Sequence, residues 1–220
     1  MVNNNKKIPI DLIMFDFDGT LANSIPSAVK AVQQMIADLG FPYKTEEEIN
    51  KHVGFGEVPL VSGSIGTEDP ATVDRAMQVY FKHYLNEGIG GILLYLHVRE
   101  TLEYFKSKKK MIISNKKDDF IKIILDKHDL SNYFIEILGG DSSPCLKPDP
   151  CTLLKALKEY NIPPDRAIFI GDMTVDVETG KNAKVWTCGV TYGFDGREKL
   201  AKASPDFIID DIRGLENVIE

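Results

Sequence analysis

The sequence predicts an α/β protein in which a doubly wound parallel sheet carries an inserted helical part. Short apolar runs alternate with stretches of helical periodicity, which is typical of strands joined by crossover helices. About 90 residues separate the first apolar run from the second, far more than one crossover helix needs. The first observation predicts the sheet, and the second predicts the insertion.

The apolar pattern places the expected elements in order. Strands are expected at residues 12–17, 111–114, 134–138, 167–170 and 185–190, with a short sixth at 206–209. Helical stretches are expected between most of these strands, at residues 24–39, 99–107, 118–128, 150–160 and 175–182. Because strand–helix–strand connections are right-handed, these elements build a sheet with helices on both faces.

The long interval is expected to be helical. Its predicted helices are residues 24–39, 45–52 and 70–86, and a Gly-rich stretch, VGFGEVPLVSGSIG, separates the last two. We therefore assign residues 26–95 to an inserted helical cap. Residues 1–25 and 96–220 form the expected core domain.

Composition limits the classes of function. The 220 residues suffice for one large domain or for one domain with an insertion. Their 43% apolar and 27% charged residues are those of an ordinary globular protein, which excludes disorder. The net charge of −7 argues against a nucleic-acid or anionic-membrane surface, because such surfaces need clustered Lys and Arg.

Polar residues follow four of the expected strands. They are Asp16 with Asp18, Ser114 with Asn115, Lys147, and Asp172 with Asp176, after the first, second, third and fourth strands. Ligands of open parallel sheets bind beyond the carboxyl ends of the strands, so these residues are expected at one site. Carboxylates gathered this closely repel one another unless a cation lies among them. Because the ligands are oxygen atoms, and no cysteine or histidine lies at ligand spacing, Mg²⁺ is favoured over zinc.

A metal ion, a lysine and a strand-end serine suit a phosphoryl group, whose transfer needs its charge neutralised and an in-line nucleophile. Asp16 can be that nucleophile and form an aspartyl phosphate. Asp18, two residues on, can serve the leaving group and then the water. The residues thus favour phosphoryl transfer to a carboxylate.

The segments DFDGT, SNK, KPDP and GDMTVD, in this order and spacing, resemble the four motifs of the haloacid-dehalogenase-like hydrolase superfamily. The resemblance covers nearly the whole chain and implies a Rossmann-like core with a cap inserted after the first motif. It implies that Asp16 is nucleophile and Mg²⁺ ligand, and that Asp18 is the acid/base with its carbonyl on the metal. It also implies that Asp172 binds the metal, with Asp176 either a ligand or a neighbour of one, and that the phosphoryl group is held by Thr20, Ser114, Asn115 and Lys147.

The same resemblance narrows the branch. Dehalogenases and phosphonatases lack a carboxylate at the place of Asp18, and Thr20 favours phosphatases over sugar phosphomutases. The segments GGDSSPCLKPDP and GVTYGF resemble those of phosphoglycolate phosphatases. Relatives acting on pyrophosphate, nucleotides or sugar phosphates share them, so the expected partner is a small phosphorylated metabolite, with phosphoglycolate favoured. A receiver-type signalling module is the alternative from another class.

Two segments depart from the family pattern. LYLHVRE stands where these phosphatases usually have Tyr-Pro-Gly, and FKSKKKMIISNK lacks residues usually found before the second strand. In the cap, Phe55 with its flanking glycines either ends a helix or forms a substrate-contacting loop. The catalytic positions themselves match.

The remaining expectations concern the compartment and assembly. Three cysteines, Cys145, Cys151 and Cys188, are expected to be reduced thiols. The first ten residues contain no apolar stretch of signal-peptide length, and no run approaches the length of a membrane span. A cytoplasmic monomer or homodimer is therefore expected.

Overall fold

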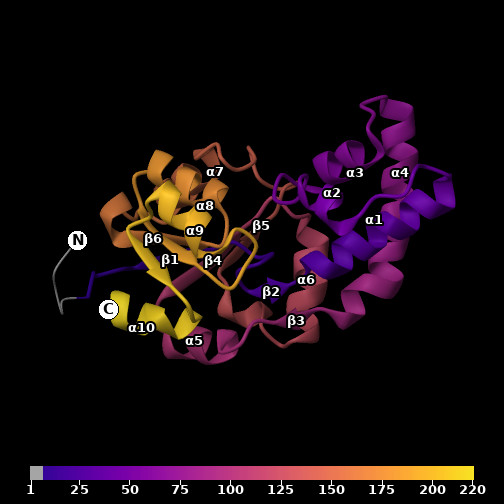
Figure 1. The fold of residues 1–220 in the computed structure, drawn as a ribbon. Helices are drawn as coiled ribbons and strands as arrows, with labels where there is room; N and C mark the ends of the chain where they lie inside the picture. The colour runs from indigo at the N-terminus through magenta and orange to yellow at the C-terminus, as the bar shows by residue number, and fades with distance from the viewer. Residues whose placement is uncertain (1–6) are drawn as a thin grey trace.

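In the computed structural model, which describes residues 7–220, six parallel strands form one sheet in the order β5-β4-β1-β6-β7-β8 (Figure 1). The strands are β1 (Leu12–Phe15), β4 (Lys109–Ile113), β5 (Glu136–Leu138), β6 (Ala167–Gly171), β7 (Trp186–Val190) and β8 (Phe207–Ile209). Strand β1 pairs with β4 on one side and with β6 on the other. The strand order therefore changes direction at β1, where doubly wound sheets bind ligands. The predicted fold class is confirmed.

Helices cover both faces of the sheet because the strands are apolar on both. Along β1, Leu12 and Met14 belong to one core cluster, and Ile13 and Phe15 to the other. The Ile13 side packs against α5 (Val98–Tyr104), α6 (Asp118–Lys127) and α10 (Leu215–Val218). The other face is covered by α7 (Cys151–Glu159) and α8 (Thr174–Asn182), beside which lies α9 (Gly196–Ala203).

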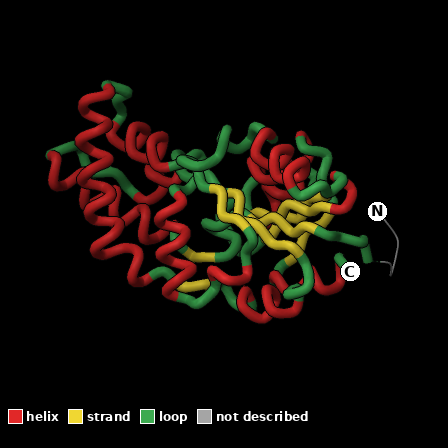
Figure 2. The backbone as a smooth tube through the Cα atoms, turned by 180° about the vertical axis from the view of Figure 1, so that it is seen from behind, coloured by secondary structure: helices red, strands yellow, loops and turns green. Residues whose placement is uncertain are grey.

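The remaining helices form a lobe beside the carboxyl ends of the strands (Figure 2). This helical lobe consists of α1 (Ile25–Leu39), α2 (Glu46–Asn50), α3 (Glu57–Ile65) and α4 (Pro70–His83), continued by a π-helical turn at Tyr84–Gly88 and a 3-10 turn at Ile89–Gly91. The antiparallel strands β2 (Ala22–Asn23) and β3 (Leu93–Leu94) pair the outgoing and returning connections. The lobe is thus tied to the sheet at both of its ends.

Helix α3 lies in the Gly-rich stretch, for which the sequence analysis predicts no helix. Leu60 and Val61 of α3 are buried in the core of the lobe. Helix α3 contacts α4 and, less extensively, α1. This packing stabilises a helix whose one glycine and two serines disfavour it locally, because tertiary contacts override intrinsic propensity.

Aromatic side chains join the lobe to the sheet domain. The ring of Tyr84 lies 4.9 Å from that of Phe120 on α6, centroid to centroid, and Phe81 packs edge-on against Phe120 at 5.4 Å. Tyr80 stacks on Tyr84 at 5.7 Å. Such pairs stabilise by about 0.5–1.5 kcal/mol each beyond the area they bury.

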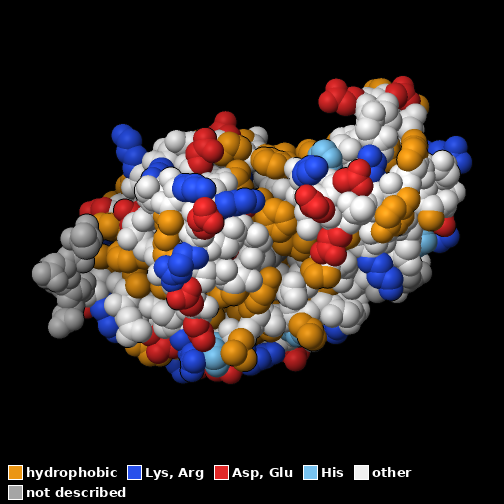
Figure 3. All heavy atoms as spheres, in the orientation of Figure 1, with side chains coloured by type: hydrophobic (Ala, Val, Ile, Leu, Met, Phe, Trp, Pro, Cys, Tyr) orange, Lys and Arg blue, Asp and Glu red, His pale blue; other side chains and the backbone are white. Residues whose placement is uncertain are grey.

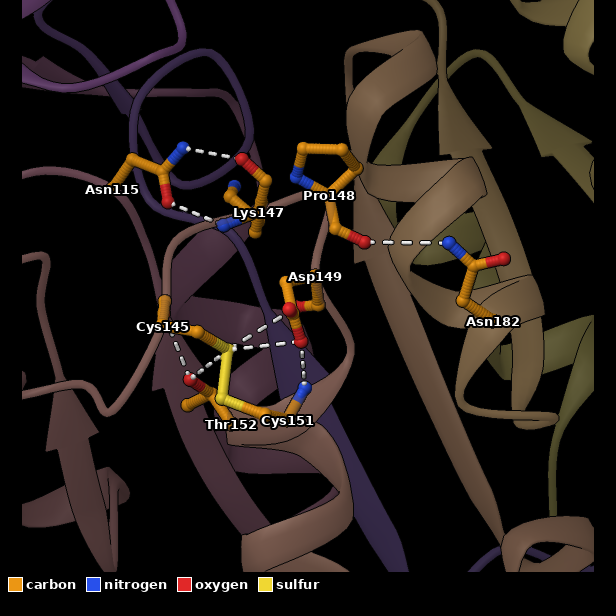
Figure 4. The surroundings of a disulfide bond; sticks show 8 residues. All are labelled: Asn115, Cys145, Lys147, Pro148, Asp149, Cys151, Thr152 and Asn182. Carbon is orange, nitrogen blue, oxygen red and sulfur yellow. Dashed lines mark hydrogen bonds between the residues drawn. A yellow bond between two sulfur atoms is a disulfide. The ribbon is translucent and has the colours of Figure 1, made fainter.

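The expectation of three reduced cysteines is wrong for two of them. Cys145 and Cys151 form a disulfide with a Cα–Cα distance of 6.1 Å (Figure 4). Cys188 is buried on β7 and is the free cysteine of residues 7–220. The three cysteines form neither a CxxC pair nor an even set, which favours free thiols, but the turn through Lys147 and Pro148 brings Cys145 and Cys151 together.

The surface carries mixed charge. On the face shown in Figure 3, Lys and Arg side chains are interspersed with Asp and Glu. Among the described residues, no helix combines the length and the apolar character that crossing a membrane requires.

Candidate active site

Three buried carboxylates gather where β1 and β6 end. Asp16 follows β1, while Asp172 and Asp176 follow β6, and the two strands pair in parallel with Phe15 beside Ile170. The Asp16 amide continues this pairing by donating to the Ile170 carbonyl at 2.8 Å. One oxygen from each carboxylate lies within 4.8 Å of the others. The predicted meeting of these residues is thus observed.

Lys147 lies among these carboxylates. Its Nζ is 2.8 Å from Asp16 Oδ1 and 2.7 Å from Asp176 Oδ1, and its side chain is almost fully buried. Burial alone lowers the pKa of this ammonium, but the charges of Asp16 and Asp176 outweigh it and the net shift is upward. Lys147 is therefore a fixed positive charge in the site.

The Asp172 carboxylate is held by two hydrogen bonds. Asp172 Oδ1 accepts from Thr20 Oγ1 at 3.0 Å, and Asp172 Oδ2 accepts from the Phe194 amide at 2.7 Å. Burial, followed by the charges of Asp176 and Asp16, raises the pKa of Asp172 well above its usual value. Burial also raises the pKa of Asp176, to about 6, although Lys147 opposes the shift.

Glycine lets the DFDGT turn approach Asp172. Gly19 has a φ of 81°, and a Cβ built there would lie 2.1 Å from Asp172 Oδ2. Gly193 allows a second close approach, because its Cβ would lie 2.2 Å from Asp172 Cβ. Side chains at these two positions would displace the carboxylate.

The acidic cluster fits a hard divalent cation. Its donors are carboxylate oxygens only, and Lys147 pairs with two of the three carboxylates, those of Asp16 and Asp176. Burial, followed by the charges of Asp176 and Asp16, disfavours the ionised form of Asp172 and raises its pKa, and a bound cation would oppose these effects. Such a donor set suits Mg²⁺.

A cavity of about 50 Å³ opens over this cluster, between the sheet and the helical lobe. The sheet side contributes Asp16, Asp18, Ser114, Asn115, Lys116, Lys147 and Met173. The lobe and its entry contribute Ser24, Ile25, Ala28, Val53, Gly54, Gly56, Glu57, Leu60 and Tyr80. The reacting groups therefore face a small space with one apolar wall.

Asn115 fastens three parts of the site together. Its Oδ1 accepts from the Lys147 amide at 2.9 Å, and its Nδ2 donates to the carbonyls of Lys147 at 3.2 Å and Gly54 at 3.0 Å. Asn115 was predicted to hold the phosphoryl group, yet these bonds orient the Lys147 loop and the lobe. Ser114 lies on the cavity wall as expected.

Two other predicted phosphate or substrate residues lie differently from expectation. Thr20 is fully buried, and its hydroxyl is bonded to Asp172, so it supports the acidic cluster. Phe55 is 45% exposed and lines an adjoining hollow with Val58 and Phe81 instead of the cavity. Its neighbours Gly54 and Gly56 line the cavity instead, because the turn at these glycines directs the Phe55 side chain outward.

Sequence reasoning missed Lys116, Glu57 and Tyr80. Lys116 is buried and its Nζ lies 3.2 Å from Asp18 Oδ2, while Ser24 Oγ donates to Asp18 Oδ1. Glu57 begins α3 and accepts at 3.0 Å from the Lys117 amide; burial raises its pKa. The SNK segment signalled Lys116, but Glu57 and Tyr80 reach the cavity only through the packing of the lobe.

Comparison with known proteins agrees with this geometry. Residues 13–190 match the family model described as haloacid dehalogenase-like hydrolase. A phosphoglycolate phosphatase of Pseudomonas syringae pv. tomato is 34% identical over 95% of this chain and 79% of its own length. A phosphoglycolate phosphatase of Vibrio vulnificus is 32% identical over 96% of both chains.

Solved structures share the fold. A predicted phosphoglycolate phosphatase from Haemophilus somnus 129pt superposes with a TM-score of 0.87 at 26% identity, over 94% of this chain and 97% of the other. A haloacid dehalogenase-like hydrolase from Bacteroides fragilis gives 0.86 at 28% identity, over 94% and 99%. These matches confirm the predicted resemblance, including that to the phosphoglycolate phosphatase-like branch. With Asp16 on the first strand rather than the third, the receiver alternative is wrong, and the chain belongs to the haloacid dehalogenase-like hydrolase family.

Proposed function

We propose that this protein is a magnesium-dependent phosphatase that hydrolyses a small phosphate monoester, with 2-phosphoglycolate favoured. The observation that carries the proposal is the position of Lys147, buried between Asp16 and Asp176 at the floor of the cavity. A nucleophilic carboxylate, a fixed cation and an acidic cluster are the parts that phosphoryl transfer to an aspartate requires. The names of the relatives support the choice of substrate.

In the first step an Asp16 carboxylate oxygen attacks phosphorus, and the bond from phosphorus to the ester oxygen breaks. Asp18, at the cavity wall, gives its proton to the departing oxygen. Lys147 offsets the negative charge on Asp16 and the transferring group. The products are the alcohol and an aspartyl phosphate on Asp16.

In the second step a water molecule attacks the phosphorus of the aspartyl phosphate. Asp18, now ionised, takes a proton from this water, and the bond between phosphorus and Asp16 breaks. Phosphate leaves, and Asp16 and Asp18 return to their initial states. One carboxyl group thus acts as acid and then as base.

Asp16, Asp172 and the Asp18 carbonyl would hold Mg²⁺, with Asp176 fixed between Lys147 and the Met173 amide. When bound, the ion supplies positive charge for the phosphoryl oxygens. Thr20 orients Asp172 for this role through its hydroxyl. The buried acidic cluster supports a metal site.

The helices within residues 26–95 would act as the cap of this active site. Val53, in the turn before α3, and Leu60 of α3 supply an apolar wall of the cavity, and Asn115 bonds the Gly54 carbonyl to the sheet side. A closed wall excludes water, which strengthens the electrostatic contacts with the transferring group. Residues 1–25 and 96–220 would form the catalytic core.

The test is an assay of the purified protein with Mg²⁺ against 2-phosphoglycolate, sugar phosphates, nucleotides, pyrophosphate and p-nitrophenyl phosphate. We expect the highest kcat/KM for 2-phosphoglycolate and no turnover after the metal is removed with EDTA. A kcat/KM for 2-phosphoglycolate well below those of other members would contradict the favoured substrate. Fractionation of the source cells would test the predicted cytoplasmic location.

A further inference from the structure

We propose that Lys116 is the specificity-determining residue that binds a second anionic group of the substrate, a carboxylate close to the phosphate. This inference rests on the proposed phosphatase function. It names a residue to which the resemblance assigns no role. It also adds a requirement on the substrate, which must be a compact molecule with an anionic group at each end.

The position of Lys116 calls for an anionic partner. Its side chain is 4% exposed, and its Nζ lies 4.6 Å above the ring of Tyr84 and 5.8 Å from that of Phe120. Aromatic faces stabilise a cation only partly, and an ammonium withdrawn from water is costly unless anions compensate it. Asp18, whose side chain is 29% exposed, pairs with it at 3.2 Å, and Glu57 is a further acidic neighbour.

The cavity separates two cations. Of the described residues that line it, Lys116 and Lys147 are the ones with positive side chains. Lys147 is held by two carboxylates beside the expected phosphoryl position, while Lys116 lies against the Tyr84 ring of the lobe. Glu57, Leu60 and Tyr80 of the lobe line the same cavity. A substrate with one anionic end for each lysine would match this arrangement.

The size of the cavity limits the distance between the two anionic groups. A cavity of about 50 Å³ favours a short chain between the two anionic groups. The apolar wall formed by Ala28, Val53 and Leu60 provides no partner for several hydroxyl groups. A two-carbon phosphate ester with a terminal carboxylate satisfies both limits.

The test compares 2-phosphoglycolate with ethyl phosphate, which has the same two-carbon length without the carboxylate. In Lys116→Met, kcat/KM for 2-phosphoglycolate should fall about 10- to 100-fold more than that for ethyl phosphate, the range of a lost charge-assisted contact. The fall should appear mainly in KM. Lys117→Met is the matched control, because Lys117 is half-buried, pairs with Asp141 at 3.2 Å and does not line the cavity.

Equal losses on both substrates would overturn the inference, since they would show that Lys116 acts through Asp18 alone. If Lys116→Met does not fold, Lys116→Gln and Lys116→Arg repeat the comparison, and only Arg should keep the preference. If the wild-type enzyme shows no preference for 2-phosphoglycolate over ethyl phosphate, the proposal that 2-phosphoglycolate is the substrate is refuted. Preference for pyrophosphate, lost in Lys116→Met, would assign the second anion as phosphate and also overturn the carboxylate inference.

A second, independent observation concerns the loop that carries Lys147. We propose that the Cys145–Cys151 disulfide is a reversible redox switch on this loop. The two cysteines flank Lys147, Pro148 and Asp149, and both are partly exposed (Figure 4). Disulfides in reducing compartments are usually transient or regulatory, and the expected cytoplasmic location makes this one unusual.

The bridge closes the loop on which Lys147 lies. On the cavity side the loop is held by the two hydrogen bonds between Asn115 and the Lys147 backbone. On the other side the disulfide joins Cys145 to Cys151, the first residue of α7. A dithiol reductant would transfer two electrons and two protons to the bridge, giving two cysteine thiols and the cyclic disulfide of the reductant. The loop would then lose its covalent anchor and keep its hydrogen bonds, those to Asn115 on the cavity side and those from Thr152 to the Cys145 carbonyl and from Asn182 to the Pro148 carbonyl.

Activity should be measured before and after complete reduction with dithiothreitol, followed by alkylation and mass spectrometry to count two new thiols. Reduction should lower kcat by about 10-fold or more, because small displacements of a charged catalytic group have effects of that order. Removal of dithiothreitol and reoxidation should restore it. The double variant Cys145→Ser/Cys151→Ser should have the activity of the reduced enzyme, and dithiothreitol should not change that activity. Unchanged activity at full reduction would overturn the switch.

Discussion

Lys147 Nζ lies 2.8 Å from Asp16 Oδ1, and both side chains are almost fully buried. This pair joins the carboxylate that follows β1 to the loop that follows β5, two strands away in the sheet. Removing one partner of a buried pair leaves the other charge uncompensated and typically costs about 3–5 kcal/mol. The pair therefore links the stability of the fold to the chemistry proposed for the site.

Lys147→Ala should lose most activity on every substrate, because the charges on Asp16, Asp176 and the transferring phosphoryl group would lack compensation. We expect kcat/KM to fall by about 10²- to 10³-fold, and the melting temperature to fall with it. Steady-state kinetics with p-nitrophenyl phosphate checks the first, and thermal unfolding the second. Lys117→Ala, next to Lys116, is the control. Normal kinetics in Lys147→Ala would remove Lys147 from the mechanism.

Asp16→Asn should abolish turnover while the protein stays folded, because the change removes the proposed nucleophile but leaves the side-chain shape. The change removes the ion pair with Lys147, which should lower the melting temperature, but it also relieves the repulsion among three carboxylates. The melting temperature should therefore fall by no more than the loss of the Lys147 pair explains. Activity and circular dichroism are the measurements. Retention of even about a tenth of wild-type activity would contradict a covalent route through Asp16.

The acidic cluster should make metal binding and stability depend on pH. Burial raises the pKa of Asp172, and it raises that of Asp176 from 3.8 to about 6. In this window the folded protein binds more protons than the unfolded chain, so the stability of the metal-free protein falls as pH rises from about 4 to about 6. Mg²⁺ competes with these protons and should bind more weakly at low pH.

Thermal unfolding with and without Mg²⁺, at pH 5 and at pH 7.5, tests whether protons and Mg²⁺ compete for the acidic cluster. The increase in melting temperature caused by Mg²⁺ should be large at pH 7.5 and small at pH 5. Asp172→Asn should reduce the increase at both. An equal or larger increase at pH 5 would show that these carboxyl groups do not bind the ion.

The sheet and the acidic cluster were predictable because both follow from local patterns. Apolar runs fix the strands, and the rule that ligands lie at the carboxyl ends of parallel strands brings Asp16, Lys147 and Asp172 together without knowledge of the packing. The roles of Thr20 and Asn115 were less accessible, since the sequence cannot show which neighbour a hydroxyl or an amide binds. Both side chains bond to protein groups at the site.

The lobe and the disulfide were harder to predict, because long-range packing determines them. Helix α3 forms in a Gly-rich stretch through the burial of Leu60 and Val61. The same packing brings Glu57 and Tyr80 to the cavity and leaves Phe55 exposed outside it. The pairing of Cys145 with Cys151 depends on the path of the loop between them.

The last prediction concerns Asp18, which lies on the cavity wall with its carboxylate bonded to Ser24 and paired with Lys116. An alkoxide leaving group needs a proton from Asp18, whereas a nitrophenolate needs it much less. Asp18→Asn should therefore lose activity on 2-phosphoglycolate at the first step. With p-nitrophenyl phosphate the first step should survive better than the second, and the phosphoenzyme should accumulate.

Rapid mixing of Asp18→Asn with p-nitrophenyl phosphate and Mg²⁺ should show a burst of nitrophenol approaching one per active site, followed by slow turnover. Acid quenching should then find the phosphate on Asp16. General acid–base catalysis is worth about 10² to 10⁴ in rate, so a much larger loss would indicate a damaged metal site instead. If no burst appears and both substrates are depressed by the same factor, Asp18 does not serve the two steps, since a shared acid and base must affect the poor leaving group more than the good one.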